Sequence, residues 1–144
     1  MFKQRLVLVL GVLLSLALFV GCDQTAKFNN LDITGSKAFS GQFELRDHLG
    51  QVRHLEDYKG KVVVMFFGYT QCPDVCPTTM VEMQGVMKLL GSSAKDVQVL
   101  FVTVDPARDT QAILAQYVPA FDPSFVGLRP DSQEALDQIT KGMK

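Results

Sequence analysis

Two apolar runs constrain the fold of this chain more than any other feature of its sequence. They are Val62–Phe67 and Val97–Val104, and only Gln98 and Thr103 interrupt the second. Both are rich in β-branched and aromatic residues, without the polar alternation of a strand that has one face in water. They therefore predict two parallel strands that are covered on both faces.

A helix is predicted between these strands. The segment Pro77–Leu90 carries Met80, Met83, Met87 and Leu90 three or four residues apart, which gives it one apolar stripe. Ordinary core packing explains methionines at this spacing better than metal binding does. A strand–helix–strand crossover is the basic unit of an α/β fold with a parallel core.

The remaining segments extend the α/β pattern. Phe39–Leu55 roughly alternates apolar and polar residues, as a β-hairpin does. Thr110–Val118 predicts a second helix, and Ser124–Leu128 a short strand. Asp131-Ser132-Gln133-Glu134 resembles a capping box that opens a last helix.

Two polar segments follow the predicted core strands directly. Gly68–Cys76 leaves the first strand, and Asp105–Thr110 leaves the second. Functional groups of open α/β sheets lie at the carboxyl ends of the strands. If the two strands are neighbours, both segments lie at one edge of the sheet.

The N-terminus has the features of an export signal. Lys3 and Arg5 precede the apolar run Leu6–Val20, which at 15 residues is shorter than the roughly 20 that a membrane-spanning helix needs. Gly21 and Cys22 follow, an arrangement that resembles a bacterial lipoprotein signal. That resemblance implies cleavage before Cys22 and lipidation of its thiol. An uncleaved anchor helix is the alternative.

We accordingly expect a signal peptide at residues 1–21, a polar tether at 22–36 and one domain at 37–144. Asp23 resembles the inner-membrane retention signal of enteric lipoproteins. The expected location is the bacterial cell envelope, on the inner (cytoplasmic) membrane and facing the periplasm. With 14 basic and 15 acidic residues, and no basic cluster interleaved with aromatics, nothing supports nucleic-acid binding.

Cys72 and Cys76 carry the chemistry of the chain. If Cys22 is lipidated, they are the only thiols left in an oxidising compartment. We expect the helix to begin at Pro77, so that both thiols lie in the preceding loop, where free amides and the positive helix end lower the pKa of a thiol. This environment favours thiolate, which redox exchange and metal binding both require.

The spacing of the two cysteines leaves several roles open. Three residues separate them, whereas a redox pair of the thioredoxin type has two. The larger ring permits a disulfide and also leaves room for a soft ion such as Cu(I). Zinc is disfavoured because no second Cys or His pair is present. A plain structural disulfide is the remaining alternative, although it would close only a short loop.

Other potential ligands are better explained as structural residues. His48 and His54 lie in the predicted hairpin, where a lone histidine is more often a surface or turn residue. Asp74, inside the cysteine loop, is better explained as a turn or helix-entry residue.

Four motifs in this order carry a family resemblance. They are Lys59-Gly60-Lys61-Val62-Val63, Phe66-Phe67-Gly68-Tyr69-Thr70, Cys72-Pro73-Asp74-Val75-Cys76-Pro77, and Val104-Asp105-Pro106 with Arg108-Asp109-Thr110. From about Phe39 onward the chain resembles the Sco/SenC copper metallochaperones. These are thioredoxin-like lipoproteins or anchored proteins that serve cytochrome c oxidase assembly.

The resemblance implies a thioredoxin-like fold and a copper site in which the thiolates of Cys72 and Cys76 bind the metal. It also implies a role for Asp105 near the site, where a carboxylate would orient the ligands or assist proton release as the thiols bind metal. A strand-ending turn is the alternative for Asp105. The implied partner is the copper-binding subunit of a cytochrome oxidase.

Two departures from the family qualify this expectation. Gln71 stands where many relatives have a histidine, and no histidine follows His54, although the family's third ligand is a histidine in a later strand. We therefore expect a C-terminally incomplete domain whose closing strands are missing. The expected cargo is Cu(I) held by two sulfurs, with Cu(II) binding reserved for a full-length form.

Three functions follow from the sequence. The first is a metallochaperone that passes Cu(I) from Cys72 and Cys76 to an oxidase subunit. The second is a membrane-tethered thiol:disulfide oxidoreductase that reduces the partner's cysteines, with Cys72 as the attacking thiol. The third is an inactive, truncated product.

Overall fold

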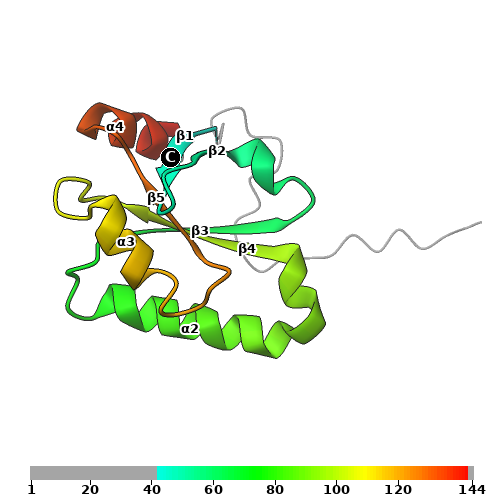
Figure 1. Cartoon of the computed structure of the whole chain (residues 1–144). Coiled ribbons are helices and arrows are strands. Elements are labelled where there is room, and N and C mark those ends of the chain that lie inside the picture. The colour runs from blue at the N-terminus through cyan, green and yellow to red at the C-terminus, as the bar shows by residue number, and fades with distance from the viewer. Residues whose placement is uncertain (1–41, 143–144) are drawn as a thin grey trace, which may run out of the picture. The chain divides into compact units, whose positions relative to one another are not determined.

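The computed structural model describes residues 42–142, which build a five-stranded sheet with helices on both faces (Figure 1). In chain order the elements are β1 (Glu44–Asp47), β2 (Val52–His54), the 3₁₀ helix η1 (Leu55–Tyr58), β3 (Val62–Gly68), α2 (Val75–Leu90), the 3₁₀ helix η2 (Gly91–Asp96), β4 (Val97–Thr103), α3 (Gln111–Tyr117), β5 (Val126–Arg129) and α4 (Gln133–Gly142). The predicted signal peptide, Cys22 and the tether lie outside the described residues.

The sheet has the strand order β2-β1-β5-β4-β3. Strands β3, β4 and β5 are parallel, while β1 is antiparallel to both β5 and β2. The register of β3 and β4 runs from Val62 opposite Val97 to Gly68 opposite Thr103. The predicted hairpin and the predicted parallel pair are therefore confirmed, and the two core strands are direct neighbours.

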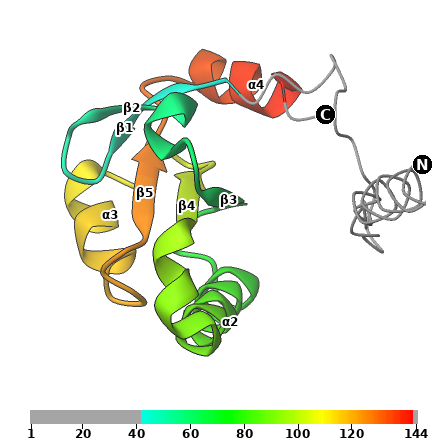
Figure 2. The same ribbon diagram turned by 90° about the vertical axis from the view of Figure 1, so that its right-hand side faces the viewer.

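Residues of β4 alternate between two separate hydrophobic clusters. Val99 and Phe101 pack with α2 and α3, whereas Leu100 and Val102 pack with residues of β1, η1 and α4. Figures 1 and 2 show this arrangement, with α2 and α3 on one side of the sheet and α4 on the other. The predicted burial of both faces holds for β4, in which every residue except the half-buried Val97 is buried. In β3 it holds only in part, because this strand lies at the sheet edge and its core residues are half-buried.

Helix α2 begins at Val75, two residues before the predicted start at Pro77. Pro77 is tolerated because it is the third residue of the helix, and N–H groups of the first turn have no intrahelical partner. Asp74 is the N-cap residue, as its interpretation as a helix-entry residue predicted. The expectation that both cysteines lie in the loop is thus wrong for Cys76, which lies in the first turn of α2.

The core role predicted for the methionines is confirmed. Met80 and Met87 are buried, and Met83 packs against the same cluster. Leu90 departs from the expected stripe: it is 36% exposed because the helix ends there and the chain turns at Gly91 with a φ of 54°.

The C-terminal elements lie close to their predicted positions. Helix α4 begins one residue later than the proposed capping box implies, since the Ser132 hydroxyl accepts the N–H of Ala135 at 3.2 Å. Ser132 therefore does the capping that was expected of Asp131. Of the helices between residues 42 and 142, none is both long and apolar enough to cross a bilayer.

Candidate functional site

The loops that follow β3 and β4 lie together at the carboxyl edge of the sheet. The N–H of Val104 donates to the carbonyl of Gly68 at 2.8 Å, which continues the strand pairing into both loops. The predicted meeting of the two polar segments at one edge is therefore confirmed. This edge carries both cysteines and both acidic residues of the second loop.

The two thiols are close but differ in exposure. Cys72 is half-buried in the loop, whereas Cys76 is only 5% exposed on α2. The N–H of Cys76 donates to Cys72 Sγ at 3.4 Å, and both side chains are free thiols. Gly68 leaves room for the buried thiol, since a Cβ at this position would lie 3.1 Å from Cys76 Sγ.

Local hydrogen bonds give the two thiols different acidities. The pKa of Cys72 is lowered to about 7, first because the Cys76 thiol donates to it, then because the amides of Asp74 and Cys76 and the hydroxyl of Tyr69 do so. Burial and the neighbouring Cys72 raise the pKa of Cys76. Above about pH 7 the pair therefore holds one thiolate, on the half-buried Cys72, and one thiol, on the buried Cys76.

Tyr69 is a site residue to which sequence reasoning assigned no role. The negative charge of Cys72 and the hydrogen bond to it raise the pKa of the Tyr69 hydroxyl, which therefore stays a donor to that thiolate. In the sequence it was marked by its position directly after a core strand and by its place in the Phe66-Phe67-Gly68-Tyr69-Thr70 motif.

Asp109 is a second residue without a predicted role. It is fully buried, and it accepts hydrogen bonds from Thr70 N at 3.0 Å, Thr70 Oγ1 at 2.5 Å and Thr103 Oγ1 at 2.5 Å. The carboxylate thus joins the cysteine loop to the end of β4. The sequence signal was its place in the Arg108-Asp109-Thr110 motif, without any indication of a contact 39 residues away.

Asp105, the acidic residue predicted to assist the site, faces the surface of the same edge. Its carboxylate pairs with the Arg108 guanidinium, and Arg108 Nη1 also donates to Gln71 Oε1 at 3.4 Å. Asp105 therefore reaches the residue before Cys72 through Arg108.

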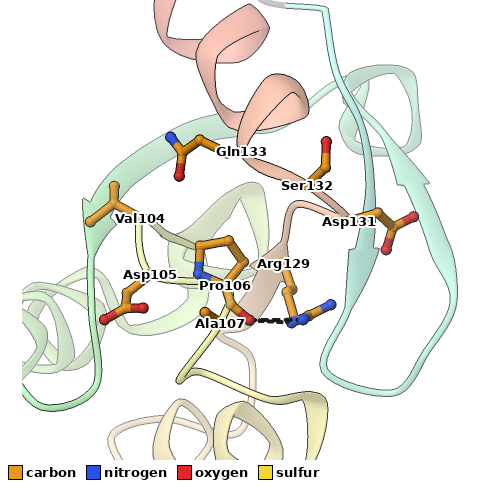
Figure 3. A pocket seen from close by; sticks show the side chains of 8 residues that line it. All are labelled: Val104, Asp105, Pro106, Ala107, Arg129, Asp131, Ser132 and Gln133. Atoms are coloured by element: carbon orange, nitrogen blue, oxygen red, sulfur yellow. Dashed lines mark hydrogen bonds between the residues drawn. The ribbon is translucent and has the colours of Figure 1, made fainter.

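A hollow of about 270 Å³ lies beside these loops (Figure 3). The loops after β4 and β5 and the start of α4 line it, with the residues Val104, Asp105, Pro106, Ala107, Arg129, Asp131, Ser132 and Gln133. Arg129 closes one wall by donating to the carbonyl of Pro106 from Nε at 3.0 Å and Nη2 at 2.7 Å. Neither cysteine lines the hollow.

The two described histidines, His48 and His54, join the hairpin to β5 and to η1. His48 Nδ1 accepts the N–H of Gly127 at 3.0 Å, and the N–H of His54 donates to Asp57 Oδ2 at 2.9 Å. His48 lies in the hairpin turn, as predicted, whereas His54 is the half-buried last residue of β2. Within residues 42–142 no three His, Cys, Asp or Glu side chains gather in a group that could hold a metal ion. The donors that the cysteine loop offers are two sulfurs, which suit a soft ion such as Cu(I).

Comparisons with known proteins agree with this architecture. The model of the SCO1/SenC family matches residues 32–144. The SCO2-like protein of Rickettsia felis is 37% identical over 94 residues, which are 65% of this chain and 46% of that protein.

Two solved structures extend the comparison to the fold. The structure of Bradyrhizobium japonicum ScoI with copper bound is 42% identical, with a TM-score of 0.67 over 73% of this chain and 67% of that one. The structure of BsSco, described as a member of the Sco family of cytochrome c oxidase assembly proteins with a disulfide switch, is 26% identical, with a TM-score of 0.58 over 69% and 59% of the two chains. The predicted α/β, thioredoxin-like fold class is thereby confirmed. The chain spans half or less of the length of the curated relatives it matches.

Proposed function

Because the chain belongs to the SCO1/SenC family, we propose that it is a metallochaperone that binds Cu(I) between Cys72 and Cys76 and passes it to the copper-binding subunit of a cytochrome oxidase. The observation that carries the proposal is the pairing of a half-buried Cys72 with a buried Cys76 at the carboxyl edge of the sheet. Relatives described as copper-bound or as oxidase assembly proteins support the cargo and the partner.

Loading begins at Cys72. Its pKa of about 7 leaves a large fraction of the sulfur as thiolate at neutral pH, ready to take Cu(I) from solution or from a donor. Cys76 then loses its proton to solvent as its sulfur becomes the second ligand, because metal binding and thiol deprotonation are linked. Release to the partner reverses this order, with partner thiolates replacing the two sulfurs one at a time.

Asp105 is proposed to steady the cysteine loop from its surface side. Its ion pair with Arg108 holds the guanidinium close to Gln71, the residue before Cys72. Such a contact orients the loop that supplies the exposed ligand, without touching the cargo. An exposed ion pair contributes little to stability, so the effect belongs to loop orientation.

A thiol:disulfide oxidoreductase is the second candidate, and the low pKa of Cys72 favours it. The Cys72 thiolate would attack a partner disulfide, and the partner's departing thiolate would take up a proton. Cys76 would then attack the Cys72 sulfur, so that the partner leaves with two thiols and this chain holds the disulfide. The disulfide switch described for BsSco supports this candidate.

The location proposed for the chain is the periplasmic side of the inner membrane, anchored through lipid on Cys22. The apolar run that ends before Cys22, and the polar residues 22–36 that follow, support this placement. Fractionation of cells expressing wild-type and Cys22→Ala chains tests it, since the variant should leave the membrane fraction only if the lipid is the anchor.

An anaerobic Cu(I) titration of the full chain against a competing chelator tests the proposed function. We expect one Cu(I) per chain, loss of binding in Cys72→Ser and in Cys76→Ser, and unchanged binding in the third cysteine variant, Cys22→Ser. Cu(II) should bind far more weakly, because it prefers additional nitrogen or oxygen donors. Tight Cu(II) binding, or no stoichiometric Cu(I), would contradict the metallochaperone.

Two further measurements on the same samples distinguish the metallochaperone from the oxidoreductase and from the inactive product. Turnover with a disulfide substrate in the absence of copper would favour the oxidoreductase. A circular dichroism spectrum of an unfolded chain would favour the inactive product.

A further inference from the structure

The most constrained charged residue at the thiol edge is Asp109, not the predicted Asp105. Its side chain is fully buried, and both carboxylate oxygens are engaged. Oδ2 accepts from Thr70 N and Thr103 Oγ1, and Oδ1 accepts from Thr70 Oγ1. Three donors therefore converge on one buried anion.

These donors come from the two segments that the site must hold in register. Thr103 is the last residue of β4, and Thr70 lies in the cysteine loop two residues before Cys72. Asp109 itself is held from two sides, since its N–H donates to the Asp105 carbonyl at 2.9 Å and the next residue, Thr110, caps α3. The carboxylate therefore fixes the cysteine loop to the end of β4 and to the start of α3.

We propose that Asp109 is the positioning residue of the thiol pair: by holding Thr70 it keeps Cys72 within bonding reach of Cys76. Cys76 is fixed by α2 and by core packing. The distance between the two sulfurs therefore depends on the conformation of the loop from Tyr69 to Pro73, which carries Cys72. The Asp109 carboxylate makes no hydrogen bond to either sulfur; it positions the loop through Thr70. Burial raises the pKa of the Cys76 thiol most, and the negative charge of Asp109 adds to this effect. The inference deepens the proposed function and rests on it in taking the two sulfurs as the working groups.

The chemistry of the contact explains why a buried acid suits this task. Hydrogen bonds to a carboxylate are roughly twice as strong as those between neutral groups. Released from these bonds, the loop samples conformations in which the sulfurs are apart, which lowers their effective concentration toward each other. Any reaction that needs both sulfurs together, whether copper binding or disulfide formation, weakens in proportion.

The test measures, without copper, the equilibrium between the dithiol and disulfide forms of Cys72 and Cys76. The full chain is equilibrated with reduced and oxidised glutathione, where the protein dithiol and oxidised glutathione give the protein disulfide and two reduced glutathione molecules. Asp109→Ala should lower this equilibrium constant by about tenfold, the size expected for losing hydrogen bonds to a charged group. Cu(I) retention against the chelator should fall in parallel.

A conservative variant distinguishes positioning from charge. In Asp109→Asn the amide oxygen can still accept from Thr70 N and Thr103 Oγ1, and the amide N–H can donate to Thr70 Oγ1, because a hydroxyl both donates and accepts. We expect this variant to recover most of the loss, to within about threefold of the wild-type constant. Equal losses in the Asn and Ala variants would overturn the positioning role in favour of a charge effect.

Asp122 supplies a matched control in the loop that precedes β5, at the opposite end of the strands from the cysteines. It accepts from Ser124 N at 2.9 Å and Ser124 Oγ at 2.7 Å, the same pair of donors that Thr70 gives to Asp109. Asp122→Ala should leave the glutathione constant unchanged, and an equal loss in both alanine variants would overturn the proposal.

A second variant tests the proposal if circular dichroism shows that Asp109→Ala is unfolded. Thr70→Val removes one contact of the loop and keeps the carboxylate. A fall of about threefold in the glutathione equilibrium constant supports the positioning role, and an unchanged constant overturns it. If the wild-type chain binds no Cu(I), the proposed function fails, while the glutathione constants still decide the role of Asp109.

Discussion

At the scale of single residues, the site depends on two cysteines of unlike chemistry. Cys76 donates its thiol hydrogen to Cys72, which lowers the pKa of Cys72 to about 7 and raises that of Cys76. The hydrogen bond from Cys76 is the main cause of the lowered pKa of Cys72. For Cys76, burial raises the pKa most, and the hydrogen bond to Cys72 comes next. Above about pH 7 the pair therefore holds one proton, and a soft cation replaces that proton when both sulfurs bind it.

The rate of alkylation against pH checks this arrangement. Since only the thiolate reacts, labelling of Cys72 by iodoacetamide should rise with a midpoint near pH 7, two units below the ordinary value of 9.0. Cys76→Ala removes the main donor, so the midpoint should move upward toward 9.0; Cys76→Ser keeps a hydroxyl donor, so it should stay near 7. Peptide mass spectrometry identifies the labelled residue. An unchanged midpoint in Cys76→Ala would rule out the donor role.

At the scale of elements, the sequence predicted what local patterns determine. The continuous apolar runs and the methionine stripe gave β3, β4 and α2, because burial of those side chains decides the structure. The start of α2 was missed by two residues, since proline is tolerated throughout the first helical turn. The role of Asp109 could not be predicted, because its contact with Thr70 exists only once β3 and β4 are paired in register.

The contact between β3 and α2 gives an element-scale prediction. A Cβ at Gly68 would lie 2.9 Å from ring atoms of both Phe101 and Phe66, besides its contact with Cys76. Gly68→Ala should therefore lower the free energy of unfolding by about 1–3 kcal/mol, as overpacking does. It should also displace the Cys76 sulfur and weaken Cu(I) retention.

Gly85→Ala is the matched control for this substitution. Gly85 lies in α2 with nothing within 4 Å of an added Cβ, so alanine there should raise the free energy of unfolding by about 0.5–1 kcal/mol. Urea denaturation midpoints at constant slope measure both effects. The packing account fails if Gly68→Ala is as stable as the wild-type chain.

At the scale of the whole molecule, the sheet is asymmetric. On one side β4 is followed by β5 and the hairpin, whereas in the described part of the chain β3 has no neighbour on its other side. Its residues Val63, Met65 and Phe67 are half-buried against the core, and Val62 is 64% exposed. An apolar strand with unpaired N–H and C=O groups is a template for pairing with another chain.

This edge predicts self-association that a charge on β3 should reduce. Val62→Lys places a charge on the unpaired edge of β3, where it should disfavour pairing of two such edges by about 0.2–1 kcal/mol, so the concentration for half-maximal association should rise about threefold. Leu89→Lys is the control, because Leu89 is 90% exposed and belongs to α2, so it offers no strand backbone for pairing. Light scattering of the full chain over a concentration series measures both. If the two variants reduce association equally, general surface apolarity drives it; a larger effect of Val62→Lys assigns it to the open edge of β3.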